Sequence, residues 1–182
     1  MENNIIHTAI TKTGKTVSFR YPTIKDAKGM MNYINKLSKE KTYILMQGGQ
    51  KTLEDEKKWL QSFLDHRDRS LIILAFYKDK VIGISDISLK DEAKKCVGSF
   101  GLSVAKDFRG EGIGKILMEL VIKESIRKMK DLKIIDLEVF GDNLIAQNLY
   151  KKLGFKEYGR LPKCLKRLGK FSDAILMYKK VK

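Results

Sequence analysis

Cysteine, proline and histidine are scarce in this sequence, and a long hydrophobic run is missing. The 182 residues include two of each of these three types. Cys96 and Cys164 have neither the spacing of a metal-binding knuckle nor the density of a disulfide scaffold, so we expect reduced thiols and no structural metal. No stretch approaches the ~18 consecutive apolar residues of a membrane-spanning helix, and residues 1–15 lack the basic and apolar segments of a signal peptide. These absences predict a cytoplasmic protein with no membrane association.

The chain is strongly basic. Lysine and arginine number 37 against 22 aspartates and glutamates, which gives a formal net charge of +15. Such an excess can neutralise the phosphates of a nucleic acid. Here it is mostly lysine and is dispersed over every segment, without the basic patch and interleaved aromatic residues that nucleic-acid binding favours. We therefore do not expect a nucleic-acid partner.

Length and composition predict one folded domain. Apolar residues make up 43% of the chain and charged residues 32%, which is a globular composition. The usual size of a domain leaves little room for two in this length. We expect residues 1–15 to be a mobile or weakly attached leader and residues 16–182 to form the domain.

Hydrophobic periodicity predicts a mixed sheet with helices around it. Helices are expected after Thr23 and Thr52, which can cap them, after the glycines near residue 112, and over 143–153. Strands are expected over 16–21, 71–77, 81–89, 97–104, 132–140, 156–161 and 172–178. Strands joined by hairpins and then alternating with helices indicate the α+β class (α/β in looser usage), with a mixed, mostly antiparallel central sheet flanked by helices.

A glycine-rich turn, Arg109 to Gly114, connects a predicted strand to a predicted helix. Glycines let the backbone fold closely around a ligand, and the first N–H groups of a helix have no intrahelical acceptor. The turn can therefore bind an anion such as phosphate, although tight packing alone would also explain it. The glycine spacing does not match the dinucleotide fingerprint G-x-G-x-x-G, and no G-K-S/T of a nucleotide triphosphate loop is present.

Two motifs in this region carry a resemblance to a known family. Arg109, Gly112 and Gly114 match the signature Q/R-x-x-G-x-G/A. A second signature, N-x-x-A-x-x-x-Y-x-K-x-G-F, is matched by Asn143, Ala146, Tyr150, Lys152, Gly154 and Phe155. The chain resembles the GNAT superfamily of N-acetyltransferases over roughly residues 16–180, most strongly over 97–155.

The resemblance implies acetyl-CoA as the cosubstrate. The backbone of the glycine turn would hold the CoA pyrophosphate, the end of the preceding strand would pair with the pantetheine amides, and the thioester would enter a gap where this strand splays from strand 134–140. A backbone N–H there could stabilise the oxyanion. The residues assigned to acetyl-CoA are Leu102, Ser103, Val104, Arg109, Gly110, Glu111, Gly112, Ile113, Gly114, Lys115, Asn143 and Ala146. Asn143 could instead serve only as a helix cap.

The resemblance also implies direct attack of the amine on the thioester, with no covalent enzyme intermediate. Tyr150 matches the position whose hydroxyl protonates the departing thiolate, and its alternative role is packing against the core. The general base stays open, because strand 97–104 lacks the carboxylate or histidine that some relatives keep there. Asp86 and Glu138 lie on predicted strands, and each could be either a base or a surface carboxylate.

The identity of the acceptor stays open as well. The first hypothesis is a primary amine of a small molecule, and the second is a protein N-terminus or lysine. A third, of another class, is a CoA-binding or nucleic-acid-associated module without catalysis. Acceptor sites in this family are built from the early helices and the final hairpin, here approximately 24–66 and 156–178. The sequence neither requires nor excludes a homodimer.

Overall fold

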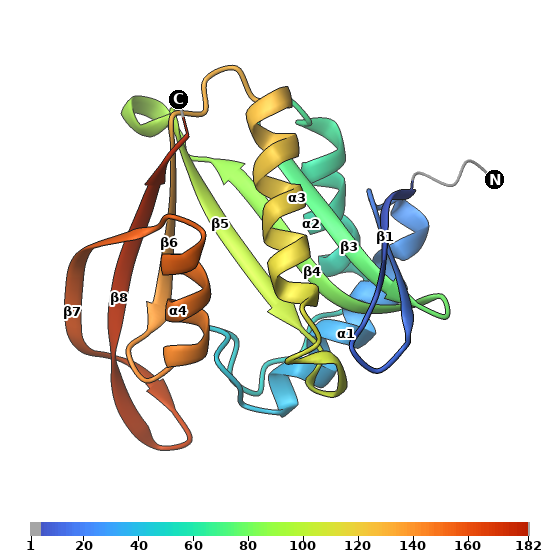
Figure 1. Cartoon of the computed structure of the whole chain (residues 1–182), viewed down its shortest axis with the longest axis horizontal. Helices are drawn as coiled ribbons and strands as arrows, with labels where there is room; N and C mark the ends of the chain where they lie inside the picture. The colour runs from blue at the N-terminus through green and yellow to red at the C-terminus, as the bar shows by residue number, and fades with distance from the viewer. Residues whose placement is uncertain (1–4, 182) are drawn as a thin grey trace.

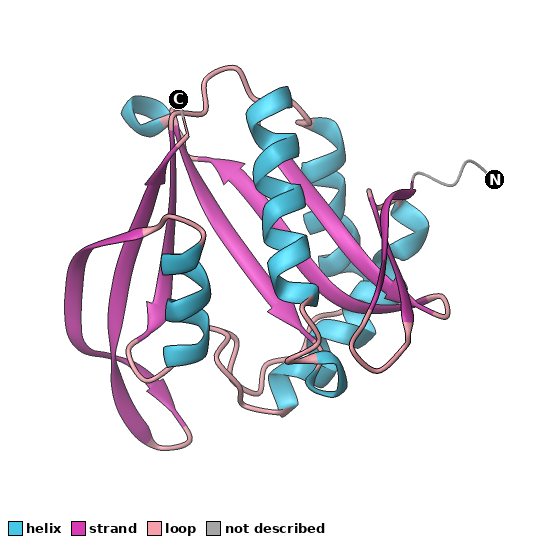
Figure 2. Cartoon of the chain, in the orientation of Figure 1, coloured by secondary structure: helices cyan, strands magenta, loops and turns pink. Residues whose placement is uncertain are grey.

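One eight-stranded sheet forms the centre of the computed structural model, which describes residues 5–181 (Figures 1 and 2). Its strands are β1 (Ile5–Ile10), β2 (Thr16–Arg20), β3 (Ser70–Tyr77), β4 (Lys80–Leu89), β5 (Val97–Val104), β6 (Ile134–Phe140), β7 (Lys156–Arg167) and β8 (Lys170–Lys180). They lie in the order β1-β2-β3-β4-β5-β6-β8-β7. Every neighbouring pair is antiparallel except β5 and β6. The predicted mixed, mostly antiparallel sheet is confirmed.

Helices cover both faces of this sheet. They are α1 (Ala27–Lys39), α2 (Leu53–Asp65), α3 (Ile113–Lys128) and α4 (Leu144–Lys152). Alternation along β3 sends Ile73 into a core with Leu117 of α3, while Leu74 packs into a second core with Leu60 of α2. Helices α3 and α4 therefore lie on one face, and α1 and α2 on the other (Figure 1).

The predicted cap of α2 is present. The hydroxyl of Thr52 accepts a hydrogen bond from the backbone N–H of Asp55 at 3.1 Å, and the Asp55 carboxylate accepts one from the backbone N–H of Thr52 at 3.0 Å. This capping box satisfies two donors at the helix start. At Thr23 the Asp26 carboxylate likewise accepts a hydrogen bond from the backbone N–H, at 2.7 Å, but the N–H of Asp26 donates to the Thr23 carbonyl. A 3₁₀ turn, Ile24–Asp26, comes before α1.

The expected leader is corrected over residues 5–10. These residues form β1, an edge strand that pairs antiparallel with β2. The turn that follows is attached to the glycine turn, because the carboxylate of Glu111 accepts hydrogen bonds from the backbone N–H and the hydroxyl of Thr13, at 3.2 and 3.1 Å. Residues 1–4 of the expected leader lie outside the described residues.

Strands β5 and β6 separate along their length. They pair only where Val97–Ser99 lie beside Ile134–Asp136, although β5 continues to Val104 and β6 to Phe140 (Figure 1). The expected splay is therefore present, and it leaves one edge of β5 without a partner strand beyond Ser99 in the described chain. None of the helices within residues 5–181 is long and apolar enough to cross a membrane.

Candidate functional site

The glycine turn leaves a row of backbone donors free. Gly110 and Gly112 have φ angles of 79° and 86°, and a Cβ built at either would meet no atom within 4 Å. Only glycine adopts this left-handed conformation at little cost. Within the described residues, no backbone N–H of 110–114 donates a hydrogen bond. The turn, together with the start of α3, can therefore surround an anion.

The side chains of the turn have partners elsewhere. Arg109 donates from Nη2 to a carboxylate oxygen of Glu40 at 2.9 Å, and from Nε to the carbonyl of Val104 at 3.0 Å. Glu111 is held by Thr13, as described above. Lys115 is exposed and forms an ion pair with Glu119 at 3.7 Å. An anion at this turn would therefore be bound by the backbone, as the sequence predicts.

The end of β5 lies against the start of α3. A Cβ built on Gly114 would be 3.8 Å from a methyl of Leu102 and 3.7 Å from one of Val104, which is ordinary contact. Ser103 points to the other face, where its hydroxyl accepts a hydrogen bond from Tyr33 of α1 at 2.9 Å. Burial raises the pKa of Tyr33, so its hydroxyl stays a donor. The structure thus places Leu102, Ser103 and Val104 beside both the turn and the open edge.

Tyr150 is buried on the α3/α4 face. Its ring packs against those of Phe100 and Phe155, with centroids 6.0 and 6.1 Å away. Its hydroxyl forms no hydrogen bond with any residue of 5–181. Burial raises the pKa of Tyr150 to about 12, so the phenol is protonated at neutral pH. Tyr150 therefore has both the packing role and a proton available for transfer.

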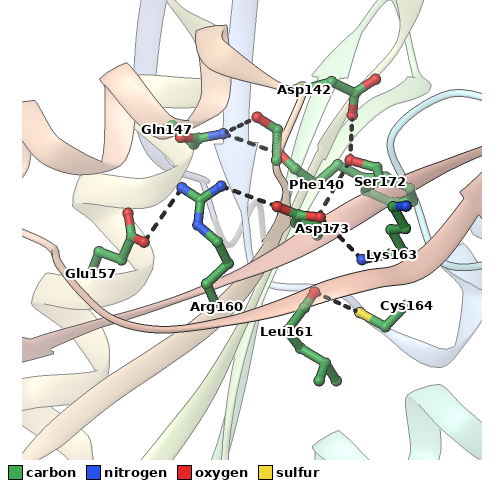
Figure 3. Close-up of polar contacts among 11 residues, drawn as sticks. Phe140, Asp142, Gln147, Glu157, Arg160, Leu161, Lys163, Cys164, Ser172 and Asp173 are labelled. Atoms are coloured by element: carbon green, nitrogen blue, oxygen red, sulfur yellow. Dashed lines mark hydrogen bonds and ion pairs between the residues drawn. The ribbon is translucent and has the colours of Figure 1, made fainter.

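The first turn of α4 is fixed to the end of β6. The side-chain oxygen of Asn143 accepts a hydrogen bond from the backbone N–H of Ala146 at 3.2 Å, so Asn143 is a helix cap. Gln147 donates to the carbonyls of Phe140 and Gly141 at 3.1 and 2.9 Å (Figure 3). These contacts set the position of α4, and with it that of Tyr150.

Asp142 joins the two segments expected to form the acceptor site. It accepts hydrogen bonds from Arg167 and Ser172, both at 3.0 Å, and from Tyr43 at 3.4 Å. Burial pushes the pKa of Asp142 up, but the bonds from Arg167 and Ser172 outweigh it and leave the pKa below its usual value. The guanidinium of Arg167 also lies 4.0 Å from the centre of the Tyr43 ring. The sequence analysis did not identify this cluster, which joins residues far apart in the chain.

Beside it, ion pairs and hydrogen bonds hold the closing hairpin together. Arg160 of β7 contacts Asp173 of β8 at 3.1 Å and Glu157 at 3.5 Å (Figure 3). The backbone N–H of Lys163 donates to Asp173 at 3.0 Å. These contacts hold β7 and β8 together beside the end of β6.

The two candidate bases differ in their surroundings. Asp86 of β4 is partly buried, and burial raises its pKa to about 7. Glu138 of β6 is exposed. Asp86 shares a face with Ile84, which belongs to the core under α1 and α2, so it lies on the sheet face opposite Tyr150. Residues 5–181 contain no group of three or more metal-ligating side chains placed to hold a metal.

This chain is similar to known proteins in sequence and in fold. The family model described as "Acetyltransferase (GNAT) family" matches residues 33–155. L-amino acid N-acetyltransferase AaaT of Escherichia coli (strain K12) is 29% identical over 106 residues, which are 58% of this chain and 65% of that protein.

Two solved structures extend the likeness to almost the whole fold. A GNAT-family acetyltransferase from Streptococcus pneumoniae superimposes with a TM-score of 0.84 at 26% identity, covering 91% of this chain and 99% of that one. The yncA structure from Salmonella typhimurium, with its cofactor acetyl-CoA, gives a TM-score of 0.82 at 14% identity and covers 91% and 94%. The family match spans the glycine turn, the splayed strands and Tyr150, and the chain belongs to the GNAT family of acetyltransferases.

Proposed function

We propose that this protein is an N-acetyltransferase that moves the acetyl group of acetyl-CoA to a primary amine of a small molecule. The observation that carries the proposal is the row of free N–H groups over 110–114, next to the opening between β5 and β6. These donors hold the CoA pyrophosphate. The pantetheine arm follows Leu102 to Val104, and the thioester lies in the opening.

Starting from a neutral amine, the reaction needs one proton removed from the nitrogen and one supplied to the sulfur. A neutral amine attacks the carbonyl carbon of the thioester, and collapse of the adduct breaks the C–S bond. The leaving thiolate takes the proton of the Tyr150 hydroxyl. The burial that raises the pKa of Tyr150 also raises that of a thiolate beside it, because both anions lose hydration. The two increases oppose each other, so the raised pKa of the phenol does not by itself prevent proton transfer to a thiolate that is buried beside it.

Two features support a small acceptor. The contacts of Asp142 with Tyr43 and Arg167 tie the segment after α1 to the β7–β8 hairpin. This connection closes one side between the two segments expected to form the acceptor site, and on that ground we favour a compact amine over an extended peptide. The similarity to an L-amino acid N-acetyltransferase points in the same direction.

Ligand binding followed by a turnover screen tests the proposal. We expect acetyl-CoA to raise the melting temperature, with no shift from NAD or ATP. Release of free CoA is then measured with amino acids, polyamines, other small amines and peptides bearing free N-termini or lysines. Turnover with peptides alone would favour a protein acceptor, and acetyl-CoA binding without turnover would favour the non-catalytic alternative. No shift with acetyl-CoA would contradict the cosubstrate assignment.

A further inference from the structure

A carboxyl group from β4 fills the space above a glycine of β5. Asp86 and Gly101 are directly paired across these antiparallel strands. A Cβ built on Gly101 would lie 2.6 Å from Oδ1 of Asp86 and 3.2 Å from its Cγ. Atoms that are not bonded do not approach so closely, so any side chain at position 101 would displace the carboxyl. The Asp86 carboxyl therefore extends over β5 rather than standing above its own strand.

This position is at the border of the opening. Pairing between β5 and β6 ends at Ser99 and Asp136, and Gly101 is the second residue beyond it on β5. A carboxyl above Gly101 consequently lies close to the place where β5 and β6 separate. Tyr150 is on the opposite face, packed against Phe100. Acid and base candidates thus approach the gap from opposite sides.

The carboxyl of Asp86 has no competing partner. It forms neither a hydrogen bond nor an ion pair within residues 5–181. Most titratable side chains on α1 and α2 are exposed to solvent. Those at least partly buried on α1, α2, the end of β4 and β6 are Tyr33, Glu56, Lys90 and Asp136, and Glu138 of β6 is exposed. Tyr33 donates to Ser103, and Lys90 is paired with Asp136. Burial alone raises the pKa of Asp86 to about 7, so both protonation states are available near neutral pH.

We propose that Asp86 is the general base of the acetyl transfer, and that Gly101 is the positioning residue that lets this carboxyl reach the acceptor amine from the neighbouring strand. The inference rests on the function proposed above. It also accounts for the carboxylate missing from β5, because the group comes from β4 across a glycine. Asp86 takes one proton from the ammonium of the acceptor, and the neutral nitrogen then forms the bond to the thioester carbon. The nitrogen's second proton leaves through solvent as the amide forms, and solvent returns the Tyr150 phenolate to its protonated form.

The test compares pH profiles of kcat/KM for the best amine of the screen, at saturating acetyl-CoA. In the unaltered protein we expect kcat/KM to fall as the pH drops below about 7, where Asp86 becomes protonated; this fall is the acid limb of the profile. Asp86→Asn should lower kcat/KM at pH 7 by about 10²–10⁴-fold and move the limb to the pKa of the free amine, because only amine already neutral in solution then reacts. Gly101→Ala should move the limb to lower pH and lower the rate, because the displaced carboxyl is less buried.

Gly98→Ala is the matched control on the same strand. A Cβ there would meet Ile87 and Leu132 on the other face, at 2.7 and 2.8 Å, so it should lower stability without moving the limb. A ¹³C titration of the Asp86 carboxyl, assigned by its absence in Asp86→Asn, tests the placement without any acceptor. We expect a midpoint near 7 that falls in Gly101→Ala and not in Gly98→Ala.

The outcomes separate this inference from the proposed function. An active protein whose limb is unchanged by Asp86→Asn, or is removed instead by Glu138→Gln, would overturn the base assignment alone. A midpoint unaffected by Gly101→Ala would overturn the positioning role. Absence of turnover in the unaltered protein with every amine would overturn the proposed function, and the base assignment with it.

Discussion

Arg109 and Glu40 form an ion pair, with Nη2 and Oε2 separated by 2.9 Å, that connects the glycine turn to the residue following α1. The same guanidinium donates from Nε to the carbonyl of Val104 at the end of β5. Arg109 therefore braces the turn between a helix of one face and a central strand. Its side chain is already engaged without an anion, and the backbone donors of the turn are not.

Removal of this brace should weaken acetyl-CoA binding moderately. We expect Arg109→Met and Glu40→Gln each to raise the Kd by up to about 5-fold, since a partly exposed pair contributes about 1 kcal/mol or less. Isothermal titration calorimetry on both variants and the double variant measures the effect. If Arg109→Met costs more than about 100-fold while Glu40→Gln is neutral, the guanidinium itself binds the pyrophosphate.

A side chain with negative charge in the glycine turn should abolish acetyl-CoA binding. Gly112→Glu adds bulk and a like charge where the phosphates are expected. Gly169→Glu, at the β7–β8 turn, is the matched control, because Gly169 has a φ of 78° and equally open surroundings. Both should lose about 1 kcal/mol of stability to backbone strain. Acetyl-CoA binding retained by folded Gly112→Glu would refute the assignment of the turn.

Loss of the Tyr150 hydroxyl should affect turnover and not stability. Tyr150→Phe keeps the ring packed between Phe100 and Phe155, and the hydroxyl has no described partner to lose. We expect kcat to fall by about 10²-fold with little change in the Kd of acetyl-CoA.

Tyr21→Phe is the control for Tyr150→Phe, and the opposite result is expected for it. It removes a hydroxyl that donates to Glu124 at 2.6 Å, far from the turn. It should lower the melting temperature and leave turnover intact. Unchanged kcat in Tyr150→Phe across the pH range would remove Tyr150 from the mechanism.

The pH dependence of the stability should contain a contribution from Asp86. Its pKa is raised from 3.8 to about 7 by burial, so the folded protein binds this proton more tightly than the unfolded chain does. The contribution of Asp86 to the free energy of unfolding therefore falls as the pH rises from about 4 to 7. Asp86→Asn has no buried carboxyl to ionise and therefore does not lose this stability. At pH 8 its free energy of unfolding should exceed that of the unaltered protein by about 1–3 kcal/mol. Urea denaturation at several pH values checks this, and an equal pH dependence in the two proteins would contradict it.

Loss of the Asp142 contacts should weaken binding of the acceptor amine and leave binding of acetyl-CoA unchanged. Asp142→Ala removes the hydrogen bonds from Arg167, Ser172 and Tyr43. The β7–β8 hairpin and the segment after α1 then lose their connection to the end of β6. We expect the KM of the amine to rise by about tenfold while the Kd of acetyl-CoA stays constant. Asp91→Ala, which breaks an exposed pair with Arg69 at 2.9 Å, serves as the control. A larger effect on acetyl-CoA than on the amine would refute this division.

Local patterns predicted most of the elements well. The strand expected over 97–104 is β5, and Thr52 caps α2 as its spacing with Asp55 indicates. The closing strands are longer than expected. In β7 the pairing shifts between Leu161 and Leu165, a stretch that includes Pro162, so the alternation that identifies a strand is broken there. The strand β1 was missed because it is an exposed edge strand with little apolar alternation to identify it.

The sequence by itself determined the order of the elements from residue 16 onward, the glycine turn and the place of Tyr150 in the motif, because periodicity, capping and short motifs act within a few residues. Tertiary structure alone decided which distant residues meet. Nothing in the alternation of β5 marks Gly101, and nothing in β4 distinguishes Asp86 from a surface carboxylate. Their relation depends on the register of two strands and on where β5 leaves β6. Strand register follows from the packing of both sheet faces together, and no local pattern contains that information.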